Sequence, residues 1–356
     1  MKGLILAGGH GTRLRPLTFT LAKQLIPIAN KPILFYVIED LRNSGITDIG
    51  IIVGHTEERI RNIKDAVGDG SKFGVKITYI EQDAPKGLAH AVLIAKDFLG
   101  SDPFVVYLGD NLIKCGIKKY VEEFKASDYD LGEFFVKYKH PEKYGVPIFE
   151  NGKLTGVIEK PKFKPDTDLV QSGIYFFRKA VFKIIETLKP SPRNELEITD
   201  AIDKMIKGGY KLKYWIAENQ WWKDAGTPED IIEANQFILE DIDTQIEGDI
   251  NKTSEIKGKV IVEKGSVIES NTKIIGPVVI GKNCTIGPNA VIGPFVSIGD
   301  GCHIRKSKIE SSIILRSSII ESNRIIKNSI VGESCKILEN KHNQFVIGDG
   351  SQVYLG

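Results

Sequence analysis

The sequence predicts an α/β protein with two domains: a Rossmann-like, mostly parallel sheet covered by helices, and then a hexapeptide-repeat, left-handed parallel β-helix. Two observations predict this fold class. Short β-branched runs alternate with amphipathic stretches over residues 1–235, and isoleucine or valine recurs at every sixth position from residue 256. Alternating strands and helices indicate right-handed βαβ units, and the sixfold period is typical of a β-helix. We place the domains at 1–240 and 241–356.

The first domain supplies buried strands and helices in strict alternation. We expect strands at 3–6, 49–53, 77–80 and 104–108, and helices at 32–43, 57–67 and 87–98. Ligands bind beyond the carboxyl ends of the strands in a parallel sheet. Residues that directly follow a strand are therefore the first candidates for a functional site.

The second domain is defined by its repeat. The anchor positions are Ile256, Val262, Ile268, Ile274, Ile280, Ile286, Ile292, Ile298 and Ile304. Three hexapeptides make one coil, so the anchors are expected to stack in rows and fill the interior. The phase slips after Ile304 and resumes through Ile314, Ile320 and Ile326.

The cysteines and the charge balance exclude several classes of protein. Cys284 and Cys302 are three hexapeptides apart and are expected to stack ~5 Å apart in adjacent coils. A disulfide between them is geometrically conceivable, but we interpret them as two small buried residues. The sequence contains no CxxC or HExxH pattern, so we expect no zinc site. The scattered, unpaired cysteines fit a reducing cytoplasm. The net charge of +2 gives no reason to expect nucleic acid or an anionic membrane as a partner, and no stretch of ~20 apolar residues could span a bilayer.

The first predicted strand leads into a glycine-rich loop, which runs from Leu6 to Leu14. Gly8, Gly9 and Gly11 let the backbone approach a ligand, and the N–H groups of such a turn, with Thr12 beside them, form a cradle for phosphate oxygens. Arg13 adds a forked cation suited to a polyphosphate. A dinucleotide-binding GxGxxG fails at Leu14, and no GK[ST] follows for a Walker A loop.

The motifs LAGGxGTRLxPxT, KQLxP and KP resemble the opening of the sugar-nucleotide pyrophosphorylases. The KQL version, followed by the repeat domain, is most similar to the long form of the glucose-1-phosphate thymidylyltransferases. In that family an arginine and a lysine grip the triphosphate and stabilise the pentavalent transition state. By match these are Arg13 and Lys23, with Gln24 as a further substrate contact. The resemblance also implies that Gln82 reads the base and that Gly87 packs beneath it.

The resemblance implies a metal site as well. Asp110, with Asn111 beside it, follows the fourth strand, and Asp224 follows Trp222 much later in the chain. Two carboxylates from distant segments suit one Mg²⁺, which also keeps waters and phosphate oxygens as ligands. The family usually has Asp-Thr-Gly where this chain has Asp-Ala-Gly from Asp224, so the carboxylate is retained and the hydroxyl is lost. Trp222 and Asn111 are expected to line the substrate site.

The sugar-phosphate half of the site is expected in the middle of the chain. Tyr144 and Gly145 resemble a segment that leaves room for the sugar ring, Glu159 one that accepts hydrogen bonds from its hydroxyls, and Lys160 one that neutralises its phosphate. A further contact lies just before the strand at 172–175, where Val170 and Gln171 are both candidates. The neighbouring segment 192–200 matches another family signature, which we interpret mainly as structural.

Together the motifs predict an enzyme that joins dTTP to glucose 1-phosphate, assisted by Mg²⁺, and assembles into a homo-oligomer partly through the β-helix. No residue in the sequence can be assigned to recognition of the 2′-hydroxyl of UTP or the thymine methyl of dTTP, so UTP is an alternative nucleotide substrate. Two other readings are a regulatory homologue without turnover and an acyltransferase in the β-helix. An acyltransferase would want a histidine in that domain, where His303 and His342 are available.

Overall fold

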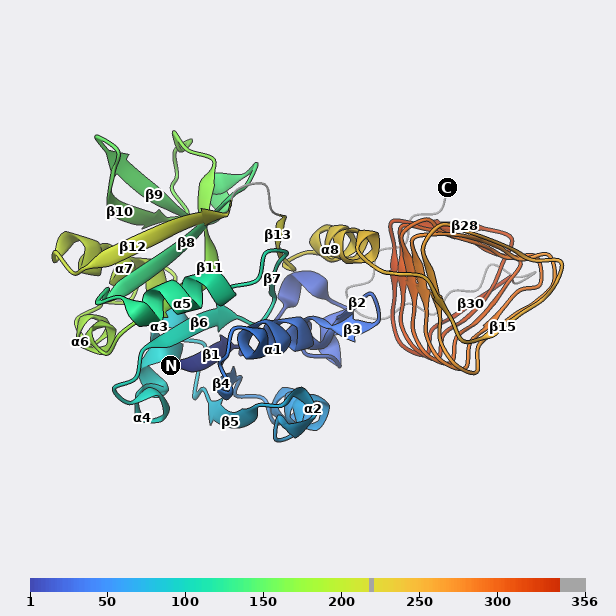
Figure 1. Ribbon diagram of the computed structural model, residues 1–356, viewed down its shortest axis with the longest axis horizontal. Coiled ribbons are helices and arrows are strands. Elements are labelled where there is room, and N and C mark those ends of the chain that lie inside the picture. Colours follow the sequence, from blue (N-terminus) through green and yellow to red (C-terminus); the bar gives the residue numbers. More distant parts are fainter. Residues whose placement is uncertain (218–220, 340–356) are drawn as a thin grey trace. The chain divides into compact units, whose positions relative to one another are not determined.

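The computed structural model describes residues 1–217 and 221–339, which form two compact units (Figure 1). The first unit contains Met1–His10, Leu21–Leu25 and Ile33–Lys223, and the second contains Gly11–Thr20, Ile26–Pro32 and Asp224–Gly356. Two short N-terminal segments thus belong with the C-terminal part of the chain. The domain boundary at 240/241 stays a prediction.

A seven-stranded sheet forms the centre of the first unit, in the order β12-β8-β11-β6-β1-β4-β5. Its strands are β1 Lys2–Leu6, β4 Asp48–Val53, β5 Lys76–Glu81, β6 Phe104–Leu108, β8 Leu131–Lys137, β11 Leu169–Phe177 and β12 Leu212–Ala217. All neighbouring strands are parallel except β11, which is antiparallel to β6 and to β8. The four strands predicted from the sequence are β1, β4, β5 and β6, so the mostly parallel sheet is confirmed.

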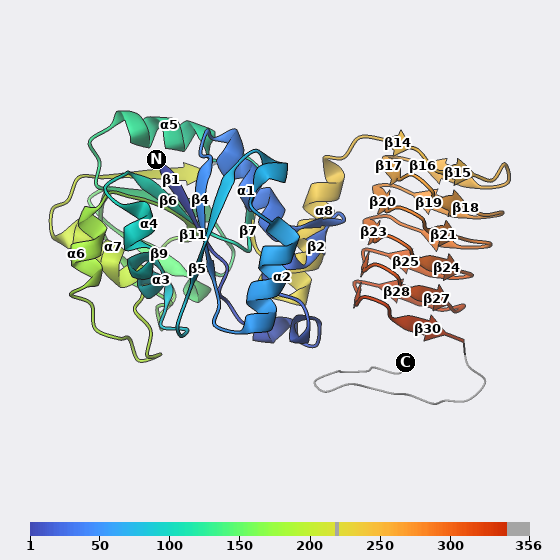
Figure 2. The ribbon, with the colours of Figure 1, turned by 90° about the horizontal axis from the view of Figure 1, so that it is seen from below.

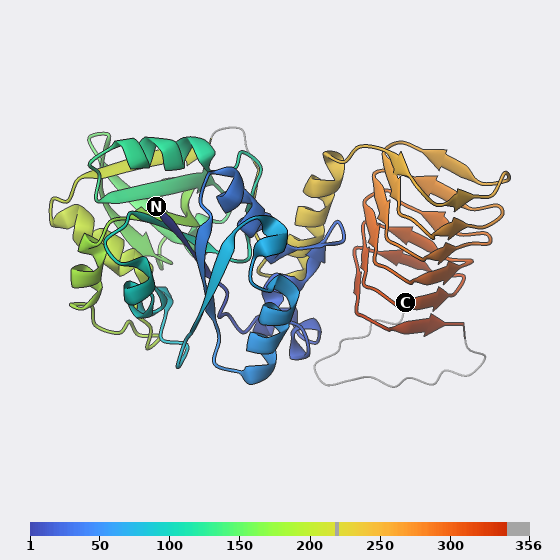
Figure 3. The same ribbon diagram turned by 60° about the horizontal axis from the view of Figure 1, so that its bottom comes forward.

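Helices cover both faces of this sheet and bury a separate apolar cluster on each (Figure 3). One face carries α1 Ile33–Asn43, α2 Glu57–Val67 and α5 Lys118–Ala126. The other carries α3 Leu88–Ile94, α4 Lys96–Leu99, α6 Ala180–Ile185 and α7 Ile198–Lys207. The helix expected at 87–98 is therefore divided in two at Ala95. Two two-stranded sheets lie outside the central sheet. One is the hairpin of β9 Gly145–Glu150 with β10 Lys153–Glu159, and the other pairs β7 Asn111–Ile113 with β13 Trp222–Asp224, two strands that are distant in sequence.

The second unit is dominated by three parallel sheets that form the sides of a β-helix, whose coils stack as Figure 2 shows. One side consists of β14 Gln245–Ile246, β17 Val260–Val262, β20 Val278–Ile280, β23 Val296–Ile298, β26 Ile313–Ile314 and β29 Ile330–Val331. The next consists of β15 Asp249–Ile250, β18 Val267–Ile268, β21 Thr285–Ile286, β24 His303–Arg305, β27 Ile319–Glu321 and β30 Lys336–Leu338. The third consists of β16 Glu255–Lys257, β19 Lys273–Ile275, β22 Val291–Ile292, β25 Lys308–Glu310 and β28 Ile325–Lys327.

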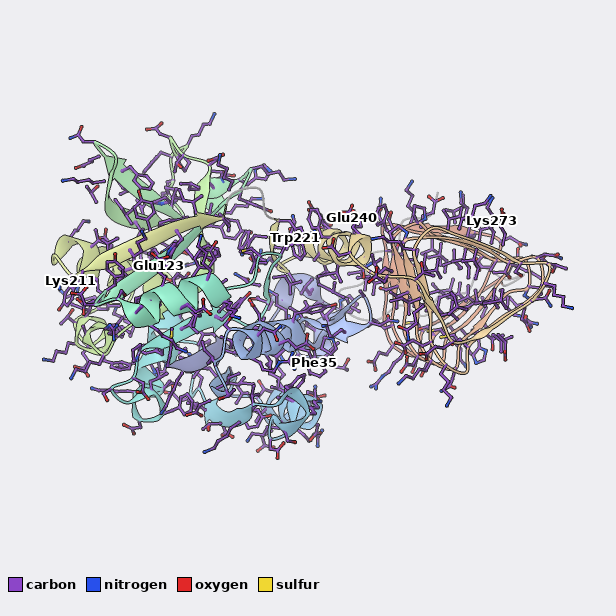
Figure 4. The ribbon with its side chains drawn as sticks, viewed as in Figure 1. Phe35, Glu123, Lys211, Trp221, Glu240 and Lys273 are labelled. Carbon is purple, nitrogen blue, oxygen red and sulfur yellow. The ribbon has the colours of Figure 1, made fainter. Side chains whose placement is uncertain are left out.

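The predicted anchors point into the interior of this β-helix. Every anchor from Val262 to Ile304 is fully buried, and the strands from β15 to β24 pair with one another at an offset of 18 residues, as Val267 does with Thr285. The phase slip consists of two shortened steps, because Ile309 takes the inward position five residues after Ile304 and Ile314 takes it five residues later, and both are fully buried. By contrast, Lys273 points outward next to the buried anchor Ile274 (Figure 4).

Cys284 and Cys302 are free thiols buried in the same apolar cluster. The thiol Sγ of Cys284 lies 3.2 Å from the carbonyl oxygen of Gly299, and that of Cys302 lies 3.2 Å from the carbonyl oxygen of Leu315. They act as small core residues, as the sequence predicts. In the described part of the chain, no helix has both the length and the apolar character that a membrane crossing requires.

Helix α8, Pro228–Glu240, is tied to the β-helix by one buried amide within the second unit. The Oδ1 atom of Asn235 accepts a hydrogen bond from the Ala29 backbone N–H at 2.8 Å and one from the Ser297 hydroxyl at 2.9 Å. The Asn30 side chain adds a bond to the Ile298 carbonyl at 2.6 Å. The segment 26–32, which also forms the short strands β2 Pro27–Ile28 and β3 Lys31–Pro32, is thereby fixed.

Replacing Asn235 by alanine is expected to destabilise the second unit by about 2 kcal/mol, since the fully buried Ser297 hydroxyl and the partly buried Ala29 N–H then lose their acceptor. Thermal unfolding followed by calorimetry measures this change. Gln236→Ala is the matched control, because Gln236 is the next residue of the same helix and is only partly buried. Equal melting temperatures for Asn235→Ala and the control would contradict the role given to this amide.

Candidate active site

The carboxyl edge of the sheet in the first unit gathers the residues that follow its parallel strands. Gly8 and Gly9 follow β1, Gln82 follows β5, and Asp110 follows β6 after one glycine. A Cβ atom at Gly8 would lie 3.0 Å from Oε1 of Gln82 and 3.7 Å from the Gly54 Cα. The glycine loop and the amide expected to read the base are therefore direct neighbours.

Gln24 fills the space between the glycine loop and the Asp110 segment. A Cβ atom at Gly9 would lie 3.8 Å from Nε2 of Gln24, and one at Gly109 would lie 3.3 Å from its Cγ. Gln24 is almost fully buried, yet its Oε1 has no hydrogen-bond partner among the described residues. A buried amide oxygen without a partner costs free energy, which fits a group that meets a ligand.

Lys23 and Asp110 form an ion pair at this edge, joining Nζ to Oδ2. Their side chains are 9% and 18% exposed, so the contact is shielded from solvent but reachable. A mostly buried ammonium without a counter-charge would be costly. The carboxylate therefore holds Lys23 beside the glycine loop, at the position where the sequence expects a triphosphate.

The second unit brings together the other two residues expected to act in catalysis. Gly11 has a φ of 61°, which glycine adopts without strain, and it opens the short turn Thr12–Leu14 that carries Arg13. A Cβ atom at Gly226 would lie 3.0 Å from Nη2 of Arg13 and 3.3 Å from Oδ2 of Asp224. The guanidinium and the carboxylate thus both lie against Gly226.

The carboxylate oxygens of Asp110 and Asp224 are of the chemical type that binds a magnesium ion. Among the described residues, no three His, Cys, Asp or Glu side chains form a group that could hold a metal ion by themselves. Mg²⁺ is usually held by one or two carboxylates, with substrate phosphates and waters as the remaining ligands, so Asp110 and Asp224 supply suitable oxygens. Because they belong to different units, their sharing of one ion stays a prediction.

Gly87 has a structural reason to be glycine. Its φ is 98°, and a Cβ atom would lie 2.5 Å from the carbonyl oxygen of Leu196. Backbone hydrogen bonds join Leu196 N–H to the Lys86 carbonyl at 2.8 Å and Ala89 N–H to the Leu196 carbonyl at 3.0 Å. The segment 192–200, interpreted as structural, therefore packs directly against the segment expected to bind the base.

The same segment also holds the carboxylate expected to bind the sugar. Glu159 accepts a hydrogen bond from the Thr199 hydroxyl at 2.8 Å, and its other oxygen lies 3.1 Å from Nη2 of Arg193. Lys160 Nζ lies 3.5 Å from that oxygen. Lys160 has a φ of 43°, an unfavourable conformation for a residue with a side chain, and its N–H bonds to the Tyr144 carbonyl at 3.0 Å. Such strain is often found at functional sites.

Gly145 lies over the amide of Gln171. A Cβ atom at Gly145 would lie 1.8 Å from Oε1 of Gln171 and 3.2 Å from the Thr199 hydroxyl. Of the two candidates left open by the sequence, Gln171 is thus the one that lies beside Gly145 and Thr199, so it stays the predicted sugar contact. Val170 is fully buried in the apolar cluster on the opposite face of the sheet.

Asn111 and Trp222 are buried and share one acceptor. The Asn111 side-chain amide and the Trp222 indole N–H both donate to the carbonyl oxygen of Ser172, the latter at 2.9 Å. The Trp222 ring also stands edge-on to Tyr144, with 5.4 Å between ring centroids. These two residues therefore fix the strand β11 and the Tyr144 side chain beside the candidate sugar site.

The sequence did not reveal several residues of this region. Glu133 is fully buried behind Gln171, and Arg193 and Thr199 hold Glu159. Only Arg193 and Thr199 had a signal, since both lie in the segment 192–200. In the β-helix, His303 is exposed on β24, and His342 lies outside the described residues.

Replacing Gly145 by alanine is expected to raise the KM for the sugar phosphate about tenfold, because the added methyl group overlaps an amide that is held on both sides. The KM for the nucleotide is expected to stay unchanged. Steady-state kinetics with each substrate varied in turn measures both values. Gly332→Ala is the control, since a Cβ atom there would make only ordinary contacts, at 3.4 Å or more. Equal KM values for the two variants would contradict the overlap.

Comparison with known proteins shows the family to which this chain is similar. The nucleotidyl transferase family model matches residues 2–241, and a model described as the GMPPB C-terminal domain matches residues 274–354. A glucose-1-phosphate thymidylyltransferase from Streptomyces antibioticus is 43% identical over 359 residues, which cover 99% of both chains.

Other relatives share the first part of the chain or most of it. The low-salt glycan biosynthesis nucleotidyltransferase Agl11 of Haloferax volcanii is 48% identical over 73% of this chain and 72% of its own. A crystal structure from Bacillus anthracis, described as a glucose-1-phosphate thymidylyltransferase in complex with a sucrose, has a TM-score of 0.63 and 39% identity. The match covers 69% of this chain and 97% of that one.

Proposed function

Because the chain belongs to the nucleotidyl transferase family, we propose that it transfers a thymidylyl group from dTTP to glucose 1-phosphate and releases pyrophosphate. The observation that carries the proposal is the convergence of the glycine loop, Gln82 and the Lys23–Asp110 pair at one edge of the sheet. Backbone N–H groups suit phosphate oxygens, an amide pairs with the edge of a base, and Lys23 supplies positive charge. The similarity to the Streptomyces enzyme over the whole chain supports dTTP and glucose 1-phosphate as the substrates.

The reaction needs alignment and charge neutralisation more than proton transfer. The sugar phosphate is largely a dianion at pH 7, since the second pKa of a phosphate monoester is ~6. One of its oxygens forms a bond to the α-phosphorus while the bond to the bridging oxygen of pyrophosphate breaks, and that electron pair leaves with pyrophosphate. Repulsion between the two anions is the main obstacle. We assign its relief to Arg13, Lys23 and Lys160.

We further propose that Asp110 and Asp224 hold Mg²⁺, an assignment that rests on the resemblance of their motifs to the family. When bound, the ion neutralises phosphate charge and orients the phosphate groups. Within the first unit, Asp110 has a second task, which is to hold the Lys23 side chain in place before the substrates arrive.

Pyrophosphate release by the purified full chain tests the function. dTTP, UTP, ATP and GTP are each combined with glucose 1-phosphate, N-acetylglucosamine 1-phosphate and mannose 1-phosphate, with Mg²⁺ or with EDTA. The fastest release with dTTP and glucose 1-phosphate, abolished by EDTA, is the expected result. A preference for UTP would keep the reaction and change the nucleotide, and no release from folded protein with any pair would overturn the proposal.

We also propose that the β-helix helps the chain to form a homo-oligomer in the cytoplasm. Its outer surface carries exposed apolar side chains on several coils, among them Val267, Ile325 and Leu338. Light scattering of the full chain measures the mass in solution. A mass equal to one chain of 39.5 kDa at micromolar concentration would contradict assembly.

A further inference from the structure

Glu133 is a carboxylic acid placed inside an apolar core. It lies in the middle of β8, opposite Tyr175 on β11 and Tyr214 on β12, and it is fully buried. One oxygen, Oε2, lies 3.1 Å from the Gln171 amide nitrogen, and Oε1 has no partner among the described residues. An ionised carboxylate with a single neutral partner is costly in such surroundings. No step of the proposed reaction uses this residue.

A row of hydrogen-bonded side chains connects Glu133 to the carboxylate expected to bind the sugar. The Gln171 amide lies next to Glu133 on one side and 2.9 Å from the Thr199 hydroxyl on the other. The same hydroxyl lies 2.8 Å from Oε2 of Glu159. The row therefore runs from the core, through Gln171 and Thr199, to Glu159.

The number of protons available along this row of side chains determines which group donates and which accepts in each hydrogen bond. Thr199 has one hydroxyl proton, but with Oε1 of Gln171 facing it, the hydroxyl stands between two acceptors. The oxygen and nitrogen of a glutamine amide have nearly the same shape, and turning the amide by 180° resolves the conflict. Nε2 of Gln171 then donates to Thr199, Thr199 donates to Glu159, and Oε1 of Gln171 accepts a proton from Glu133. Glu159 is the accepting end of the row, because Arg193 and Lys160 form ion pairs with it. Every contact then has one donor and one acceptor only if Glu133 is a neutral acid.

We propose that neutral Glu133 is a positioning residue for the sugar phosphate, because it orients the Gln171 amide so that Thr199 gives its single proton to Glu159. The inference rests on the proposed function, in which Glu159 binds the sugar hydroxyls. Glu133 touches neither substrate and acts through Gln171 and Thr199.

The pKa of Glu133 agrees with a neutral acid. Burial raises it from 4.5 to about 8, and the hydrogen bond from Gln171 opposes the rise. The titratable groups on the neighbouring strands are Tyr175 on β11 and Lys213 and Tyr214 on β12, and those on α7 are Asp200, Asp203, Lys204 and Lys207. Burial raises the pKa of Tyr175 well above its usual value, so Tyr175 stays neutral when Glu133 loses its proton.

Ionisation of Glu133 should therefore reverse the direction of the hydrogen bonds that Gln171 makes. A carboxylate only accepts hydrogen bonds, so Gln171 turns its Nε2 toward Glu133 and its oxygen toward Thr199. The Thr199 hydroxyl then faces two acceptors again and divides its single hydrogen bond between them, so its hydrogen bond to Glu159 becomes weaker. Binding of the sugar phosphate weakens as the pH rises through about 8, whereas binding of the nucleotide is not affected.

The test compares the full-length wild type with Glu133→Gln and Glu133→Leu between pH 7 and pH 9. For the wild type, the KM for glucose 1-phosphate is expected to rise about fivefold, the size of one ordinary hydrogen bond, and the KM for dTTP to stay constant. Glu133→Gln keeps a permanent donor to Gln171, so its KM for glucose 1-phosphate stays low at every pH. Glu133→Leu offers no donor, so its KM is about fivefold higher throughout.

The melting temperature gives a readout that does not need turnover. The folded-state pKa of Glu133 is raised, so wild-type stability is lost as the pH rises from the ordinary glutamate value toward about 8. Glu133→Gln lacks this loss, and its advantage over the wild type should grow from pH 5 to pH 8. A difference in melting temperature between the wild type and Glu133→Gln that stays constant from pH 5 to pH 8 would contradict a neutral Glu133. An identical pH dependence of the sugar-phosphate KM in the wild type and Glu133→Gln would overturn the positioning role, whereas an inactive wild type would overturn the proposed function instead.

Discussion

Asparagine at position 110 is expected to lower kcat about a thousandfold, because it removes both the hard anionic ligand of the proposed metal and the counter-charge of Lys23. Asp224→Asn is expected to have an effect of the same size. The measurement is the rate of pyrophosphate release at saturating substrates over a range of Mg²⁺ concentrations. For Asp110→Asn the loss of the ion pair should also lower the melting temperature, since the mostly buried Lys23 is left without its carboxylate.

The double variant tests whether the two carboxylates act on one ion. Residues that act as a unit are strongly non-additive, so Asp110→Asn combined with Asp224→Asn should be hardly slower than either single variant. Independent roles would instead multiply the two losses. Asp102→Asn is the control, because Asp102 is exposed and lies in the turn before β6. A single variant with near wild-type turnover at low Mg²⁺ would rule its carboxylate out as a metal ligand.

The part of the site that follows the parallel strands could be predicted from the sequence. Gly8, Gln82 and Asp110 each come within two positions of the end of a predicted strand, and parallel strands bring their carboxyl ends to one edge. Gly8 and Gln82 are 74 residues apart in sequence, but both follow strands of this sheet, which the alternation of strands and helices predicts. The same holds for the β-helix, where a local period places every anchor inside.

Groups that act through contacts between distant side chains could not be predicted. Glu133 stands in a strand beside apolar neighbours, and its sequence context gives no sign that Gln171, 38 residues later, is its partner. Gly145 was expected to make room for a sugar ring, whereas the structure shows that it must also leave room for the Gln171 amide. The slip at Ile309 was visible as a break in the period, but its inward position followed only from the strand pairing.

Alanine at position 13 is expected to lower kcat/KM by two to three orders of magnitude, which is the usual effect of removing one positioned donor to a developing charge. Arg13 projects from the turn Thr12–Leu14, directly after Gly11, and it is exposed. Its guanidinium is therefore accessible to an anionic ligand. Arg13→Lys keeps the charge but loses the planar fork, so about a tenfold loss is expected.

Arg15 is the matched control for Arg13, since it is equally exposed and lies two residues later. Its guanidinium stacks over the Phe19 ring at 5.1 Å, so Arg15→Ala should change kcat/KM less than twofold. Arg13→Ala should keep the wild-type melting temperature, because the residue's role is with the substrate and an exposed side chain adds little to stability. If Arg13→Ala and Arg15→Ala retained the same kcat/KM, the transition-state role of Arg13 would have to be given up, and Lys23 would remain as the candidate cation for the triphosphate.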